Sequence, residues 1–320
     1  MKWNSTELRR AWRPTRSLPP RAAAIAAAVL TCLGLAFAPA RAAEKLRLVA
    51  SINDLGSIAA SVGGDRVEVA TIARSGGDPH RVEVLPSYMV RVARAQLYLK
   101  VGMGLDQWAD PIIDGSHNGK LLVVDCSPGV SVLEKPTTKV DASMGDVHPD
   151  GNPHYWLDPR NAAVVAQTIA GALSRLDPAH TAEYTSRAEA FASATADLVG
   201  RGRQQVAALP THEILTYHRS WSYFASTFGL EVVSTIEPIP GIPPTARHLD
   251  DLVGIVKERQ IRVLLAEPYF SDDAGKFLQR QTGLRIVQES ASCDDVRPGS
   301  YLIHLERVLG ELAGPAGVQH

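Results

Sequence analysis

Short apolar runs alternate with amphipathic stretches along most of the chain. The short runs are rich in β-branched residues and bounded by turn-forming residues, which is typical of buried strands. In the first half of the chain, strands are expected at residues 46–50, 67–73, 97–101 and 121–125. Between these runs, apolar positions recur three or four residues apart, and they predict helices at residues 53–62 and 86–95.

The second half of the chain repeats the alternation. Strands are expected at residues 213–216, 231–236, 262–267 and 284–288, and helices at residues 248–260, 272–282 and 301–312. Strand, helix and strand in this order predict parallel sheets covered by helices. Ligands of such sheets bind beyond the carboxyl ends of the strands, so two facing halves would form a cleft between them.

The segment between the two halves predicts one long helix. Residues 137–153 are rich in Pro, Gly, Asp and Thr and are expected to form a loop. Residues 160–175 have helical periodicity, and residues 177–208 continue it over a length of about 45 Å. Gly200 and Gly202 weaken the pattern in the last two turns.

Together these elements predict an α/β fold of two lobes, each with a parallel β-sheet flanked by helices, joined by one long backbone helix. A chain of 320 residues is long enough for two such lobes. The expected divisions are a signal peptide at 1–42, an N-terminal lobe at 43–176, a linking helix at 177–209 and a C-terminal lobe at 210–320.

The first 42 residues have the pattern of an export signal. A basic segment ends at Arg21, an apolar run covers residues 22–38, and Ala40-Arg41-Ala42 matches the small-residue pattern of a cleavage site. The run of about 17 residues is marginal for a spanning helix, and a retained membrane anchor is the alternative. We therefore expect an exported, periplasmic protein.

Charge and cysteine content narrow the function further. The first 42 residues hold seven of the 33 basic residues and one of the 34 acidic ones, so the remainder is acidic by about seven charges. Nucleic acid is therefore not expected as a partner, because phosphate binding needs clustered Lys and Arg. Outside this segment only Cys126 and Cys293 remain, and two unpaired buried thiols are at least as expected as a disulfide.

Histidine is the residue type that points to chemistry. His80 and His154 each follow a proline in a turn-rich segment, and His218 follows the strand expected at residues 213–216. Proline restricts the backbone before the imidazole, so a ligand there loses little entropy when it binds a metal. Three imidazoles and one oxygen would suit tetrahedral zinc. Taken singly, however, each histidine is more often a solvated turn residue or a core residue.

Five segments, in order, resemble the metal receptors of the ABC importers for zinc and manganese, the cluster A-I solute-binding proteins. They are Gly-Asp-Pro-His at 77–80, Pro-His-Tyr-Trp-Leu-Asp-Pro at 153–159, Tyr-His-Arg-Ser-Trp-Ser-Tyr-Phe at 217–224, Glu-Pro-Ile-Pro-Gly-Ile-Pro-Pro at 237–244 and Glu-Pro-Tyr-Phe at 267–270. The resemblance extends from residue 44 to about residue 312. It implies that His80, His154 and His218 bind the metal directly.

The fourth ligand departs from the family's pattern. The family usually has an Asp after the last strand, whereas this chain reads Val-Gln-Glu-Ser-Ala at 287–291. Glu289 is the nearest carboxylate and the expected ligand, with Glu267 or a water as alternatives. Zinc-specific members often carry a His- and Asp-rich loop before the second ligand, where this chain has only His148. A solvated loop residue is its expected role, with transient recruitment of metal as the alternative.

Residues beside the ligands have two possible roles. Asp78 and Asp158 are equally expected to accept a hydrogen bond from a ligand imidazole or to cap a helix. The aromatic residues near the histidines are expected to fill the core rather than to line a binding cleft; they are Trp156, Trp221, Tyr223 and Phe224.

The resemblance implies a receptor and not an enzyme. Such a receptor would capture Zn²⁺ as a monomer in the periplasm and deliver the ion to an ABC-type permease in the inner membrane. A histidine at position 218 favours zinc, because imidazole-rich sites suit zinc whereas added carboxylates suit manganese. A manganese or iron receptor of the same family is the first alternative, and a surface adhesin is another. A secreted zinc hydrolase with Glu267 as general base is less favoured, because no hydrolase motif accompanies the histidines.

Overall fold

The computed structural model describes residues 44–141 and 144–314. The signal peptide predicted at residues 1–42 lies outside the described residues. Within the two described ranges, no helix is both long enough and apolar enough to cross a membrane.

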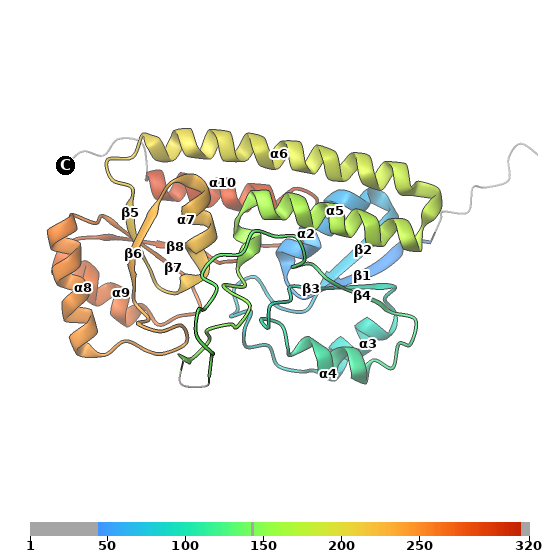
Figure 1. The fold of residues 1–320 in the computed structure, drawn as a ribbon, viewed down its shortest axis with the longest axis horizontal. Helices are drawn as coiled ribbons and strands as arrows, with labels where there is room; N and C mark the ends of the chain where they lie inside the picture. The colour runs from blue at the N-terminus through green and yellow to red at the C-terminus, as the bar shows by residue number, and fades with distance from the viewer. Residues whose placement is uncertain (1–43, 142–143, 315–320) are drawn as a thin grey trace, which may run out of the picture. The chain divides into compact units, whose positions relative to one another are not determined.

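Two four-stranded sheets, both fully parallel, form the framework of residues 45–314 (Figure 1). The first has the order β2-β1-β3-β4, with strands β1 Leu46–Ala50, β2 Val67–Thr71, β3 Leu97–Lys100 and β4 Leu122–Asp125. The second has the order β6-β5-β7-β8, with strands β5 Glu213–Thr216, β6 Glu231–Thr235, β7 Val263–Ala266 and β8 Arg285–Gln288. The predicted fold class is confirmed by this arrangement.

Helices cover both faces of each sheet because successive strand residues point to opposite sides. The helices are α2 Asn53–Gly63, α3 Pro86–Ala93, α4 Ala109–Gly115, α5 Pro159–Leu176, α6 Thr181–Ala207, α7 Ser222–Phe228, α8 Ala246–Arg259, α9 Asp272–Thr282 and α10 Ser300–Ala313. In β1, Leu48 and Ala50 belong to the core shared with helices α2 and α5, whereas Val49 packs with α3 and α4. Helices α8 and α9 pack on one side of the second sheet.

Helix α6 is the long helix that the sequence predicts, preceded by a short turn of 3₁₀-helix, η5 Pro178–His180. It packs against α2 and α5 of the first half and against α7 and α10 of the second, and it runs above both sheets in Figure 1. Helix α10 also reaches α2. One continuous apolar core therefore joins elements of both halves.

Gly202 lets α6 lie close to its neighbours in the second half. A Cβ at this position would lie 2.4 Å from the Phe228 ring and 2.8 Å from the Leu309 side chain. Gly200, two residues earlier, faces open space. The helix continues through both glycines, and at Gly202 close packing compensates for the low helix propensity.

Replacing Gly202 by alanine is expected to lower the free energy of unfolding by roughly 1–2 kcal/mol, since overpacking outweighs the gain in helix propensity. Replacing Gly200 by alanine should instead raise it by up to about 1 kcal/mol. Urea unfolding followed by circular dichroism measures both. Equal effects of the two substitutions would contradict the close packing at Gly202.

Candidate metal centre

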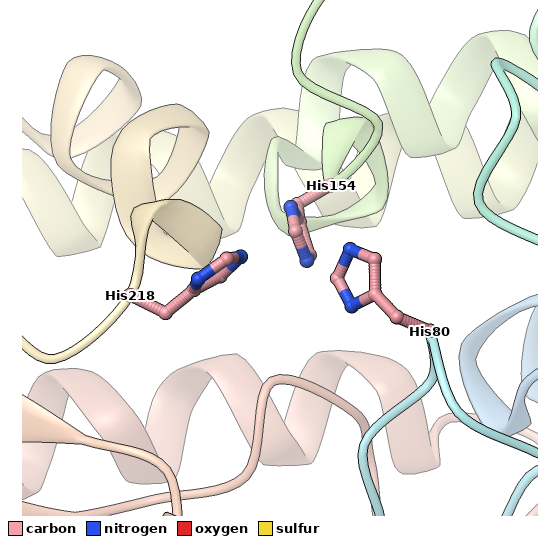
Figure 2. A group of neighbouring side chains, drawn as sticks. All are labelled: His80, His154 and His218. Atoms are coloured by element: carbon pink, nitrogen blue, oxygen red, sulfur yellow. The ribbon is translucent and has the colours of Figure 1, made fainter. Parts of the chain in front are cut away.

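Three histidine side chains from separate parts of the chain point toward one another (Figure 2). His80 lies in the loop after β2, His154 directly precedes the 3₁₀ turn η4 Tyr155–Leu157, and His218 separates β5 from the 3₁₀ turn η6 Arg219–Trp221. One nitrogen of each ring lies within 4.8 Å of the others. The ring centroids are 5.0–5.5 Å apart, and the group has the size of a site for one metal ion.

His80 and His154 are held by the same local arrangement, the sequence Asx-Pro-His. The Oδ1 atom of Asp78 accepts hydrogen bonds from the backbone N–H of His80 at 2.9 Å and from its Nδ1 at 3.0 Å. Asn152 does the same for the backbone N–H and Nδ1 of His154, at 3.0 and 2.9 Å. Each acceptor assigns the ring proton to Nδ1, so Nε2 presents a lone pair.

His218 is oriented by a carboxylate that is distant in sequence. Its Nδ1 lies 2.7 Å from Oε2 of Glu237, which follows β6 and also accepts a hydrogen bond from the Gly241 backbone. Both side chains of this pair are buried. As in the other two rings, an oxygen acceptor lies at Nδ1. A carboxylate at this position fixes the tautomer and strengthens Nε2 as a metal ligand.

The inward nitrogens of this group lack protein partners. Nε2 of His80 and Nε2 of His154 are buried and form no hydrogen bond. Buried polar atoms without a partner are rare and costly in proteins, and they are expected where a ligand binds. The lone pairs and their convergence fit a divalent cation.

Burial and neighbouring charge separate the pKa values of these imidazoles. Burial, together with the nearby His80 and His218, holds the pKa of His154 well below its usual range. Burial alone would lower the pKa of His218 too, but the hydrogen bond that this ring donates to Glu237 and the charge of Glu267 raise it. His154 therefore stays neutral while His218 holds a proton more readily.

Glu267 lies at the end of β7, near His218. Its side chain is buried, and neither carboxylate oxygen has a hydrogen-bond partner. Burial raises the pKa of this carboxyl to about 7. It is not part of the group of three converging histidines.

His148 is not a solvated loop residue, contrary to that expectation. Its ring packs beside the ring of His80, with centroids 5.4 Å apart, and its Nε2 is buried without a hydrogen-bond partner. Burial lowers the pKa of His148 to about 4. The sequence places this residue in a polar loop and contains no sign of this packing.

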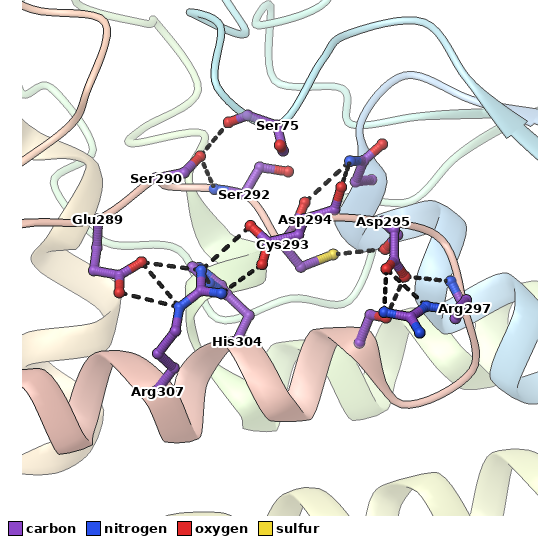
Figure 3. Close-up of polar contacts among 12 residues, drawn as sticks. Ser75, Glu289, Ser290, Ser292, Cys293, Asp294, Asp295, Arg297, His304 and Arg307 are labelled. Atoms are coloured by element: carbon purple, nitrogen blue, oxygen red, sulfur yellow. Dashed lines mark hydrogen bonds and ion pairs between the residues drawn. The ribbon is translucent and has the colours of Figure 1, made fainter.

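The structure does not bring Glu289 to the histidines. Its carboxylate forms an ion pair with Arg307 of α10 at 3.0 Å, and Arg307 also binds Asp294 (Figure 3). The family resemblance made Glu289 the expected fourth ligand, but the guanidinium of Arg307 from α10 holds its side chain. The carboxylate partners of Arg307 are not foreseeable from the local sequence.

The neighbouring residues take distinct roles. Asp78 contacts His80, whereas Asp158 caps α5 by accepting a hydrogen bond from the Arg160 backbone and pairs with the Arg160 side chain. The aromatic residues are buried as expected; they are Trp156, Trp221, Tyr223 and Phe224. Of the two possibilities left open for Cys126 and Cys293, a disulfide or two buried thiols, the structure has the two buried and unpaired thiols.

Two hollows meet at His218. A small one of about 40 Å³ is lined by His148, His154 and His218 among others. A larger one of about 350 Å³ is lined by Asp78, His80, His218 and Glu237, together with aromatic side chains. The fold and the site together define a two-sheet α/β protein with three converging histidines that could hold a metal ion.

The chain belongs to the ZnuA family, described as the periplasmic component A of the zinc-uptake complex, whose model matches residues 48–313. Members of this family are metal-binding receptors of ABC transporters, and the predicted resemblance is confirmed.

Relatives in this family are named for different metals. The chain is 28% identical to the iron-binding protein YfeA of Yersinia pestis over 251 residues, covering 77% of this chain and 76% of the relative. It is 25% identical to the high-affinity zinc uptake system protein ZnuA of Haemophilus ducreyi over 274 residues, covering 81% and 88%. The solved structure of FpvC from Pseudomonas aeruginosa with Mn²⁺ matches at 25% identity and a TM-score of 0.70, covering 84% and 97%.

Proposed function

We propose that this protein captures Zn²⁺ in the periplasm through His80, His154 and His218 and delivers it to an ABC-type permease. The observation that supports this proposal is the shared arrangement of the three rings. Each has Nδ1 bound to an oxygen acceptor, and one nitrogen of each ring belongs to a group spanning less than 4.8 Å. Glu289 is not included among the ligands, because it is paired with Arg307.

The preference for zinc over manganese follows from the donor atoms. Three imidazoles suit zinc, whereas manganese favours sites richer in carboxylate oxygen. One observation supports a second candidate, a manganese or iron receptor. Both oxygens of the buried Glu267 lack partners, and a carboxylate moving onto the metal would favour these ions.

A receptor differs from a catalytic zinc protein in its coordination. A receptor fills the coordination sphere and buries the ion, whereas a catalytic zinc keeps a position for water. We propose that the protein acts as a monomer with the permease as its partner, and that it makes and breaks no covalent bond.

Metal competition on the purified protein tests this function. Residues 43–320 are stripped of metal and offered equimolar Zn²⁺, Mn²⁺ and Fe²⁺, and bound metals are quantified by mass spectrometry. One Zn²⁺ per chain is expected. A dominant Mn²⁺ or Fe²⁺ signal would transfer the proposal to the second candidate, and absence of binding would refute both.

Replacing Glu237 by glutamine tests the support of His218. The neutral amide keeps the size of the side chain but removes the charge that strengthens the imidazole as a ligand. Loss of such a supporting group typically costs roughly 10–100-fold in metal affinity, and about tenfold is expected here. Chelator competition measures it. Unchanged affinity would mean that His218 does not need this partner.

A further inference from the structure

His148 shares one feature with His80 and His154 of the proposed site. Its Nε2 is buried and has no hydrogen-bond partner. The ring lies 5.4 Å from the ring of His80, inclined by 32°. A buried imidazole nitrogen without a partner, beside the proposed ligands, is available to a metal ion.

The small hollow beside these rings fits an ion. It has a volume of about 40 Å³, and His148, His154 and His218 contribute to its wall. A volume of this size holds a single ion or a water, since small-molecule sites typically need about 300 Å³ or more. A buried nitrogen without a partner at such a hollow is where an ion or an ordered water binds, and three further imidazoles at the same place favour the ion.

We propose that His148 supplies the fourth nitrogen ligand of the captured metal, an inference that rests on the proposed function. Zinc in a closed site takes four ligands in tetrahedral geometry, and the convergent group provides three. His148 lies outside the set of nitrogens within 4.8 Å of one another, so its ring moves inward when the ion binds.

The loop around His148 is anchored on both sides of this residue. On one side, the Asp146 backbone N–H donates to the Pro240 carbonyl at 2.8 Å. On the other, the Asn152 backbone N–H donates to the Leu133 carbonyl at 2.9 Å. The short turn between these anchors carries His148, so a side-chain rotation and a local backbone shift are enough to bring Nε2 to the ion.

A fourth imidazole determines which ions the site accepts. Four nitrogen donors suit zinc and, to a similar degree, cobalt and nickel, whereas manganese favours carboxylate and water oxygen. His148 is therefore a specificity-determining residue, and its removal should weaken the discrimination against Mn²⁺.

X-ray absorption of the zinc-loaded protein counts the imidazoles on the metal directly. Four are expected in the wild-type protein, and three with one oxygen ligand in His148→Ala. Chelator competition should show Zn²⁺ affinity lower by about tenfold or more in this variant. Mn²⁺ affinity should change less, so the ratio of Zn²⁺ affinity to Mn²⁺ affinity should be lower in the variant than in the wild-type protein. Pro149→Ala, in the same turn, is the matched control and should leave both affinities unchanged.

The outcomes separate this inference from the proposed function. Three imidazoles in the wild-type protein, with unchanged Zn²⁺ affinity in His148→Ala, would overturn the role of His148 and leave the receptor proposal intact. Absence of Zn²⁺ binding by the wild-type protein would overturn both. If His148→Ala disturbs the loop, His148→Asn keeps a polar side chain there, and it should also lose the fourth imidazole.

Discussion

Replacing His154 by alanine is expected to lower the affinity for Zn²⁺ by about 100-fold or more. Structural zinc sites bind with roughly 10–16 kcal/mol, so one of four ligands contributes about 3 kcal/mol if the energy is shared evenly. The substitution also leaves the Asn152 side chain without the ring it orients. Competition with a zinc chelator of known affinity measures the change.

A surface histidine provides the control for this variant. His212 is exposed and precedes β5, at the opposite end of the strand from His218. His212→Ala should bind Zn²⁺ as the wild-type protein does, whereas His80→Ala and His218→Ala should resemble His154→Ala. Wild-type affinity in His154→Ala would show that this imidazole is not a ligand.

Zinc affinity is expected to fall about tenfold per pH unit below the pKa of His218, because the metal displaces one proton from this ring. The pKa of His218 is raised by Glu237 and Glu267, so the loss begins at a higher pH than for an ordinary histidine. Above this pKa the His218 ring is already neutral, so it no longer makes the Zn²⁺ affinity depend on pH. His154 adds no such dependence near neutrality, since its pKa is held well below its usual range.

The Glu237→Gln variant checks the sign of this dependence. Without the carboxylate, the pKa of His218 should decrease. The Zn²⁺ affinity of the variant should therefore begin to fall at a lower pH than that of the wild-type protein. Calorimetric titrations in buffers of different ionisation enthalpy count the protons released. Release of three protons near neutrality, or of none well below the pKa of His218, would contradict the assignment.

Much of the fold could be predicted because its elements have clear periodicity. The eight strands lie where the apolar runs predict them, with ends differing by one or two residues. Helices α4 and α7 did not emerge from the pattern, since helices of seven residues contain too few apolar positions to show a period. The packing that keeps α6 helical across Gly202 depends on Phe228 and Leu309, and the local sequence contains no trace of it.

The site was predictable where local turns determine it. The Asx-Pro-His segments bring acceptor and imidazole together within three residues, and Asp78 and Asn152 carry this signal. Glu237, which follows β6, contacts His218, which follows β5, and Arg307 of α10 contacts Glu289. Such partners depend on tertiary packing, so a single sequence cannot assign them.

The three histidines proposed as ligands are 74 and 64 residues apart in the chain and come from both halves of the fold. An unfolded chain that held all three would have to close two long loops, each at an entropic cost of several RT. A partly folded chain therefore has no high-affinity site, and metal loading reports that both sheets are assembled. Refolding in the presence of Zn²⁺ should show metal capture as the last kinetic phase, after the sheets and α6 have formed.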